Sequence, residues 1–253
     1  MTNNELFSFC ISSDFSSFRK FDSSGDFYLT YYFIPRPTVL GILASIIGLE
    51  KSSANSLPWW EELKDTKIGI TPLLNKDFIK HLVVYNNSTG AASFDDKKRG
   101  QTLIIREQLL IKPQYRIYVE LNSKTDKIFN LLKNHRSVFT PYLGKNEFRA
   151  EISNIQKNTY VPFSGTCEIS SIYPLCSEIS KKSYQTTWID QNETIQILES
   201  HPYMYGNDYK YVQENFVFSI NKKVNTESIK TQIDGIFVQL DNKKVVYLYG
   251  GRK

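Results

Sequence analysis

The chain has 253 residues, of which 41% are hydrophobic and 14% aromatic, enough for one large domain or two modest ones around a real core. Thirty-one Lys and Arg residues against 26 Asp and Glu give a formal net charge of +5, which permits an anionic partner such as nucleic acid without requiring one. Three cysteines with no CxxC pair and no paired histidines nearby argue against a disulfide framework and against a zinc site.

The cysteine usage and the absence of targeting segments indicate a protein of the reducing cytoplasm. The N-terminal sequence MTNNELFSF lacks the basic region and the apolar stretch of a signal peptide. The longest apolar segment, TVLGILASIIGL at residues 38–49, is too short to span a bilayer. We therefore expect a soluble, cytoplasmic protein with no membrane partner.

The first third of the chain predicts two extended segments and a buried helix. ELFSFCIS alternates as a strand does, and DFSSFRKF then places aromatic residues beside Arg19 and Lys20. FYLTYYF is a second extended run. A helix is expected within IPRPTVLGILASIIGLEK, with Thr38 as its cap and Gly48 near its end, and its apolar residues on nearly every side predict burial.

After a loop containing Trp59 and Trp60, the middle of the chain reads as strands around a polar insertion. KIGITPL, HLVVYNN and the two halves of residues 102–121 are strand-like, with Pro113 between the halves. Residues 86–100, NNSTGAASFDDKKRG, have the composition of a mobile loop or hairpin tip. A helix at 125–134 precedes TPYLGKNEF at 140–148, and AEISNIQKNTYVP is the next strand.

The remainder is strand-rich, with polar turns and a short helix expected within residues 226–234. HPYMYGNDYKY, residues 201–211, is interpreted mainly as a turn. The order of elements predicts an α+β fold: a ferredoxin-like, split βαβ domain at 1–160 carrying the insertion, and a smaller β-rich domain at 161–253. Several RNA-binding modules share this plan.

Catalytic motifs are scarce. His81 opens an apolar strand, His135 follows a helix and His201 precedes Pro202, and none lies in HExxH or beside an obvious nucleophile. GxSxG, a Walker loop and GxGxxG are absent. We expect no catalytic residue, cofactor or metal ion.

Nucleic-acid binding has more support. Aromatic residues lie next to Arg or Lys in FSSFRKF, YYFIPRP, KPQYRIY and PYLGK. Rings that stack on bases and cations that neutralise phosphates are the mixture that holds single-stranded RNA. The alternative is that these aromatics belong to the core and the cations to its rim.

Three motifs in this order and spacing carry a family resemblance: FRKFDSS with YLTYYFIPRPTVLGILASIIGLE, then REQLLIKPQYRIYV, then PYLGKNEF. Together they resemble the Cas-five family of CRISPR-associated RAMP proteins, most like the type I-B form. The resemblance implies a ferredoxin-like domain with an inserted β-hairpin thumb at about residues 86–102 and a degenerate C-terminal domain.

In function, the resemblance implies a subunit of the antiviral Cascade complex. Such a subunit holds the 5′ handle of the CRISPR RNA (crRNA), contacts the backbone subunit and the large subunit, and meets target DNA through the complex. By position, the RNA-binding residues would be Phe18, Arg19, Lys20, Arg36, Thr38, Lys97, Lys98, Arg99, Tyr142, Gly144 and Lys145. In PYLGKNEF, Leu143 and Phe148 would anchor the turn in the core.

Two other functions remain open. A more distant branch, type I-C, implies a metal-independent endoribonuclease that cuts precursor crRNA with a tyrosine, a lysine and a histidine. Tyr31 or Tyr32 and Lys145 match two of these, and His135 is the nearest histidine in sequence, because Asn146 and Glu147 follow Lys145. A RAMP-like scaffold that binds only protein is the third possibility.

Overall fold

The computed structural model describes residues 4–21, 23, 27–49, 58–75, 78–89, 101–175, 187–189, 195–206 and 210–252. Over this part of the chain the protein is mostly β-structure with few helices, and none of those helices is long and apolar enough to cross a membrane. The helices are α1 (Arg36–Ile47), α2 (Pro58–Leu63), α3 (Asp126–Lys133) and the 3-10 turn η2 (Thr226–Ser228). The strands are β1 (Glu5–Ser12), β2 (Phe15–Ser16), β3 (Phe27–Tyr28), β4 (Ile68–Pro72), β5 (Ile79–Thr89), β6 (Gln101–Ile111), β7 (Gln114–Glu120), β8 (Glu151–Pro162), β9 (Thr166–Glu168), β10 (Tyr173–Pro174), β11 (Thr187–Ile189), β12 (Ile195–Tyr205), β13 (Tyr211–Ile220), β14 (Lys223–Asn225), β15 (Ile233–Leu240) and β16 (Val245–Arg252).

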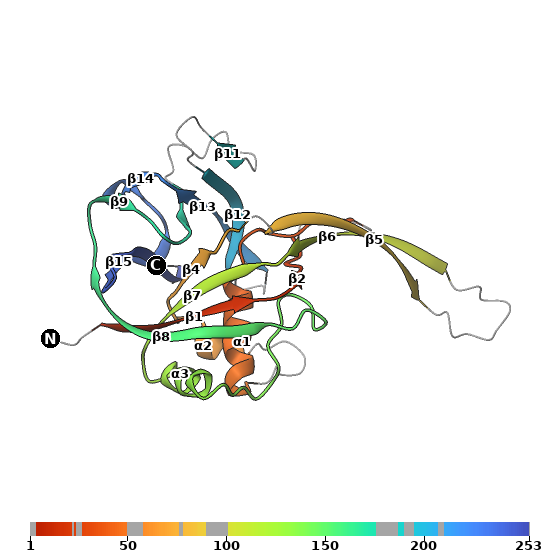
Figure 1. Ribbon diagram of the computed structural model, residues 1–253, viewed down its shortest axis with the longest axis horizontal. Coiled ribbons are helices and arrows are strands. Elements are labelled where there is room, and N and C mark those ends of the chain that lie inside the picture. Colours follow the sequence, from red (N-terminus) through yellow and green to blue (C-terminus); the bar gives the residue numbers. More distant parts are fainter. Residues whose placement is uncertain are drawn as a thin grey trace.

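Six of these strands form a closed antiparallel barrel in the order β1-β7-β4-β16-β15-β8 (Figure 1). Four of them come from the first part of the chain, and α1 and α3 lie in the connections between β1 and β4 and between β7 and β8. β15 pairs with β8, and β16 meets β4, which closes the barrel. A single hydrogen-bonded sheet therefore crosses residue 160, where the sequence predicts a boundary between two domains.

The alternation of side chains along β1 gives the barrel sheet two apolar faces. Phe7, Phe9 and Ile11 point to the face that carries α1 and α3, where the larger core lies. Leu6 points to the other face and joins a smaller cluster with residues of β15 and β16. The C-terminal strands thus cover an apolar face that β1 would otherwise expose.

Helix α1 is buried, as its sequence predicts, because most of its faces contact strands or other helices. It begins one turn earlier than expected: Pro35 is the N-cap, so Thr38 lies inside the first turn and does not cap the helix. Gly48 ends it with a left-handed φ of 79° and bonds back to Ala44, as expected of a C-terminal glycine. Helices α1, α2 and α3 lie together on one side of the sheet (Figure 1).

β5 and β6 pair along their full lengths and form a long hairpin that projects from the body of the protein (Figure 1). At its base β6 also pairs with β2 and β3. Residues 90–100, which make up most of the predicted insertion, lie outside the described residues.

The C-terminal part differs from the sequence prediction in two places. Residues 201–205 of the expected turn belong to β12 and Tyr211 begins β13, so tyrosines that were assigned to a turn pair across a hairpin. The expected helix within 226–234 is one 3-10 turn at 226–228, and β15 already begins at Ile233.

A buried arginine joins α1 to two other segments. Arg36 is fully buried, and its Nη1 donates to the carbonyl oxygen of Tyr203 at 3.0 Å. Its Nη2 donates to the carbonyl oxygens of Lys64 and Thr66 at 2.6 and 2.7 Å. Burial is the main reason that the pKa of Arg36 falls to about 10, so the guanidinium remains charged at neutral pH.

Replacing this side chain should therefore destabilise the fold. Arg36→Met removes the donors of three carbonyl groups, and we expect the free energy of unfolding to drop by about 3 kcal/mol or more, because unpaired buried polar groups are costly. Urea denaturation followed by tryptophan fluorescence measures this. Arg136→Met, at an exposed site, is the matched control and should change stability by less than about 0.5 kcal/mol. Equal stability of the two variants would contradict the structural role of Arg36.

Candidate nucleic-acid interface

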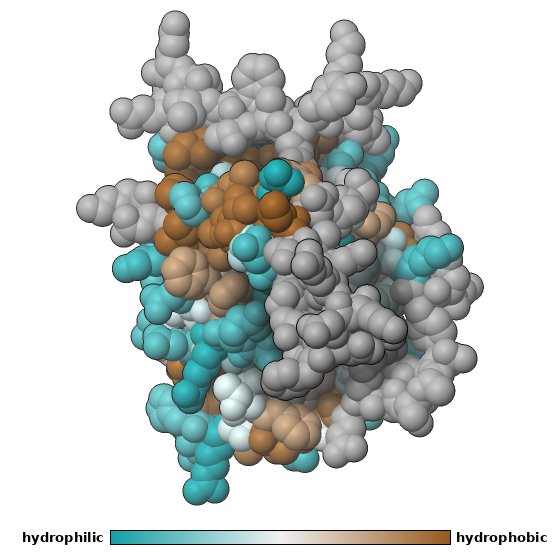
Figure 2. Space-filling model, turned by 90° about the vertical axis from the view of Figure 1, so that its right-hand side faces the viewer, coloured by the Kyte–Doolittle hydropathy of each residue, from teal (hydrophilic) through white to brown (hydrophobic). Residues whose placement is uncertain are grey.

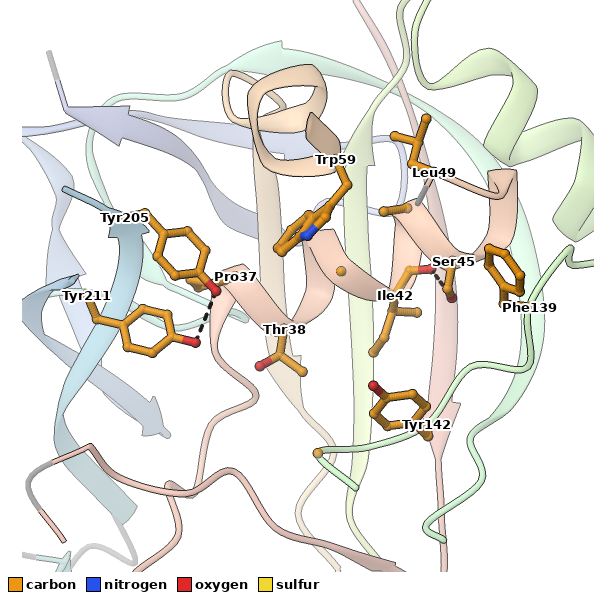
Figure 3. A pocket seen from close by; sticks show the side chains of 13 residues that line it. Pro37, Thr38, Ile42, Ser45, Leu49, Trp59, Phe139, Tyr142, Tyr205 and Tyr211 are labelled. Carbon is orange, nitrogen blue, oxygen red and sulfur yellow. Dashed lines mark hydrogen bonds between the residues drawn. The ribbon is translucent and has the colours of Figure 1, made fainter. Parts of the chain in front are cut away.

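Two adjoining pockets lie where four segments of the chain meet: the loop after β2, the first turns of α1, the turn at 140–148 and the β12–β13 hairpin. The larger pocket has a volume of about 410 Å³ and the smaller about 360 Å³. Thr38, Gly144 and Tyr211 line both pockets, so the two form one continuous surface. We call the larger the aromatic pocket (Figure 3) and the smaller the charged pocket.

The charged pocket holds an exposed guanidinium. The Cζ atom of Arg19 lies 3.6 Å from the centroid of the Tyr28 ring, a close cation–π contact. Arg19 makes no ion pair with any residue that the structure describes. Its planar group is therefore held in place on the ring and remains able to meet an anion.

A buried carboxylate in the same pocket holds Lys145. Glu107 is only 2% exposed, and its Oε1 accepts a hydrogen bond of 2.8 Å from the Ser17 hydroxyl. Its Oε2 accepts from the Lys145 ammonium and, at 3.2 Å, from the Tyr85 hydroxyl. Burial alone would lower the pKa of Lys145, but the hydrogen bond and charge of Glu107 outweigh it, so the pKa is raised. Lys145 stays positively charged at the pocket edge.

A second buried carboxylate, Glu199 on β12, lies beneath the loops that border the charged pocket. Its Oε1 is 3.2 Å from the Lys20 ammonium and 3.7 Å from that of Lys80. Its Oε2 accepts from the backbone N–H groups of Tyr32 and Phe33 at 2.8 and 3.2 Å. Desolvation lowers the pKa of Lys80 to about 8, although Glu199 opposes the shift. This carboxylate binds two loops and the root of β5 to β12.

The turn at 140–148 owes its position to Gly144. This residue has a φ of +90°, and a Cβ atom at this position would lie 1.8 Å from the carbonyl oxygen of Ser17. Leu143 beside it is fully buried, and its carbonyl accepts from the Ser17 N–H at 3.4 Å. The glycine therefore permits close contact between two backbone segments of this chain, which sets Tyr142 and Lys145 on either side.

The structure places six of the residues proposed from sequence along the two pockets: Phe18, Arg19, Thr38, Tyr142, Gly144 and Lys145. Tyr142 is 45% exposed and faces the aromatic pocket (Figure 3).

Three of the proposed residues are largely buried. Phe18 is 3% exposed and packs in the core, and Lys20 and Arg36 are buried against protein partners. Direct contact of these three residues with RNA stays a prediction. The proposed thumb residues Lys97, Lys98 and Arg99 are outside the described residues.

Sequence reasoning missed several residues of this surface. Trp59 was assigned to a loop but lies in α2, and Tyr205 and Tyr211 were assigned to a turn but flank the aromatic pocket. The clustering of aromatic residues in these two stretches of sequence was the signal that could have indicated a binding surface. Glu107 and Lys80 gave no signal, because their partners are distant in sequence.

The sequence matches the family model described as CRISPR-associated protein (Cas_Cas5) over residues 10–230. The chain belongs to this family. No curated protein matches the sequence.

Among solved structures, a CRISPR protein from Archaeoglobus fulgidus has a similar fold, with a TM-score of 0.50 at 13% identity over 98% of this chain and 99% of that one. A chain of a CRISPR RNA-guided surveillance complex aligns with a TM-score of 0.49 at 9% identity, over 89% of this chain and 93% of that one. A further Cas protein aligns at 0.41 and 14% identity, over 88% and 97% of the two chains.

The close approach at Gly144 predicts a specific loss of stability. In Gly144→Ala the new Cβ meets the Ser17 backbone, which cannot move aside as a side chain can, and the left-handed φ adds strain. We expect the free energy of unfolding to fall by at least about 2 kcal/mol. Gly251→Ala is the control, because a Cβ there has no atom within 4 Å. Chemical denaturation of both variants measures the two losses of unfolding free energy. If Gly144→Ala loses no more stability than Gly251→Ala, the close contact with Ser17 is wrong.

The lowered pKa of Lys80 predicts a pH dependence. Between pH 8 and 10.5 Lys80 is mostly neutral in the folded chain and charged in the unfolded chain, so the unfolded state binds more protons. The contribution of Lys80 to stability should therefore rise with pH through this window. The measurement is denaturation of the wild type and of Lys80→Met at several pH values. The difference between their unfolding free energies, wild type minus variant, should increase with pH, and a constant difference would contradict the lowered pKa of Lys80.

Proposed function

We propose that this protein is a non-catalytic crRNA-binding subunit of a type I Cascade complex, of the I-B form, that holds the 5′ handle of the crRNA. The observation that carries the proposal is the continuous surface on which Arg19 and Lys145 lie next to a pocket of aromatic side chains. Family membership supplies the CRISPR context.

The charge of this surface favours an anionic ligand. The four cations Arg19, Lys20, Lys80 and Lys145 outnumber the two carboxylates, Glu107 and Glu199, which pair with the lysines only. Burial of two of the lysines weakens solvent screening, so their charge contributes to the potential at the surface. A phosphate backbone crossing Arg19 and Lys145 would neutralise this excess.

The strand order and the projecting hairpin support two structural parts of the proposal. We assign β8-β1-β7-β4, with α1 and α3 as its connections, to a ferredoxin-like RAMP unit. The β5–β6 hairpin is assigned to the thumb, because it is long and projects from the body (Figure 1). Lys97, Lys98 and Arg99 lie between its strands in sequence and would follow the RNA backbone.

The hairpin also carries a surface suited to a protein partner. Leu82, Val84 and Ile104 are 47%, 60% and 47% exposed. They lie on one side of the two strands, since Val84 pairs with Arg106 and Ile104 with Asn86. Apolar side chains gather on the face from which the hairpin projects (Figure 2). This face is suited to the contact with the backbone or large subunit, through which the protein would meet target DNA.

A metal-independent endoribonuclease is the second candidate, because Tyr31 and Lys145 line the same charged pocket. The positions of the three histidines favour binding over cleavage. His135 lines a different pocket, His81 is an exposed residue of β5, and His201 is fully buried with its pKa lowered by desolvation to about 3. No histidine is among the described residues that line the charged pocket with Lys145, and histidine is the commonest base for such a proton transfer.

Labelled repeat RNA incubated with the full chain in EDTA, with a scrambled RNA beside it, tests both candidates. We expect intact RNA and a retarded band for the repeat RNA only. A discrete cleavage product would favour the endoribonuclease. If neither RNA gives a retarded band, with the chain alone or with its backbone partner, the RNA-binding function is wrong. That result would favour a scaffold that binds only protein.

In the same assay Arg19→Ala should weaken binding about tenfold, and the slope of log affinity against log salt should become shallower by about 0.7, as for one lost phosphate contact to a single strand. Lys124→Ala, an exposed lysine beside α3, is the matched control and should keep the wild-type slope. An unchanged slope for Arg19→Ala would remove that residue from the interface.

A further inference from the structure

The aromatic pocket has a shape and lining distinct from the charged pocket beside it. We propose that it holds one unstacked base of the bound RNA, while Arg19 and Lys145 contact the phosphates next to that base. This inference rests on the proposed RNA-binding function and names the part of the ligand that enters this pocket.

The floor of the pocket is one face of α1. Thr38, Gly41, Ile42 and Ser45 follow the i, i+3, i+4, i+7 spacing that places residues on one side of a helix, and all four line the pocket. The walls come from other segments: Trp59 with Tyr205 on one side, and Phe139 with Tyr142 on the other (Figure 3). A planar group that enters between these walls meets ring surfaces on both sides.

The wall formed by Trp59 and Tyr205 is already ordered before any ligand binds, because neighbouring rings pack against it. The rings of Tyr205 and Tyr211 are stacked, with centroids 4.8 Å apart, and their hydroxyl groups are 3.1 Å apart. Trp60 meets the Tyr205 ring edge-on at 4.7 Å, and Trp59 does so at 6.2 Å. Because these contacts fix the rings, stacking a ligand on this wall costs little conformational entropy.

The chemistry of the lining favours a neutral, flat ligand over a phosphate. None of the described residues that line the aromatic pocket is charged. Polar groups are present on the floor: the Thr38 hydroxyl has no hydrogen-bond partner among the described residues, and the Ser45 hydroxyl donates to Ile42, so its oxygen is left to accept. Ring surfaces with a few hydroxyl groups suit a nucleobase, which stacks and forms hydrogen bonds at its edge.

Continuity with the charged pocket distinguishes a nucleotide from an apolar peptide side chain. Thr38, Gly144 and Tyr211 border both pockets, so a ligand in one touches the edge of the other. A nucleotide has a flat neutral base joined to an anionic phosphate, and the two pockets offer a matching pair of environments. The turn fixed by Gly144 supplies Tyr142 to the base side and Lys145 to the phosphate side.

A scan with single abasic nucleotides tests this assignment. The full chain is titrated with repeat RNA in which each handle position in turn lacks its base. We expect one position at which the loss of the base weakens binding about 5- to 150-fold, the range for stacking of a base on aromatic side chains. Tyr142→Ala and Trp59→Leu should weaken binding of intact RNA, yet have little further effect on the RNA that is abasic at that position.

The matched control is Phe15→Ala, because Phe15 is 44% exposed, almost the same as Tyr142, and lines neither pocket. It should keep the wild-type profile at every position. A different result would overturn the base pocket: the chain binds repeat RNA specifically, no abasic position weakens binding, and Tyr142→Ala and Trp59→Leu bind intact RNA as the wild type does. The proposed function would then remain.

Two other results would also show that the base pocket is wrong. If the wild-type chain binds no repeat RNA, the proposed function and the base pocket fall together. If the abasic profile is flat while Tyr142→Ala abolishes assembly with the protein subunits, the pocket is a protein-docking groove and the base assignment is wrong.

Discussion

The arrangement of the site depends on one buried charge, the carboxylate of Glu199. It meets the ammonium groups of Lys20 and Lys80 and the backbone N–H groups of Tyr32 and Phe33. These partners come from the loop after β2, the approach to α1 and the root of the projecting hairpin. A buried carboxylate is tolerated only when it is paired and hydrogen-bonded, so the segments around it must keep these positions.

Glu107 has a comparable role nearer the surface. It connects β6 to the loop after β2 through Ser17 and to the turn at 140–148 through Lys145. The two carboxylates together explain how cations remain at the site without mutual repulsion, and why the pocket beside them can be lined by neutral aromatic groups. The charged groups thus lie in one of two neighbouring environments and the other is lined by uncharged groups, which is the division that a nucleotide presents.

Several local features followed from sequence, because they depend on residues close together in the chain. The burial of α1 and its end at Gly48 were predicted from its composition, and Leu143 was predicted to anchor the turn that carries Lys145. Other features depend on partners that are distant in sequence. Arg36 and Lys20 resemble phosphate-binding residues in sequence, but partners on β12 and beyond α2 bury them. Nothing local distinguishes a buried cation from an exposed one.

The sequence by itself determined the family, through three ordered motifs, and the β-rich character of the chain with its few helices. Tertiary structure alone decided that β15 and β16 close the barrel begun by β1, and that Trp59, Tyr205 and Tyr142 line one pocket over α1. The reason is the range of the interactions. Periodicity and turn chemistry report on neighbouring residues, whereas strand order, burial of charge and the lining of a pocket arise from contacts between segments far apart in the chain.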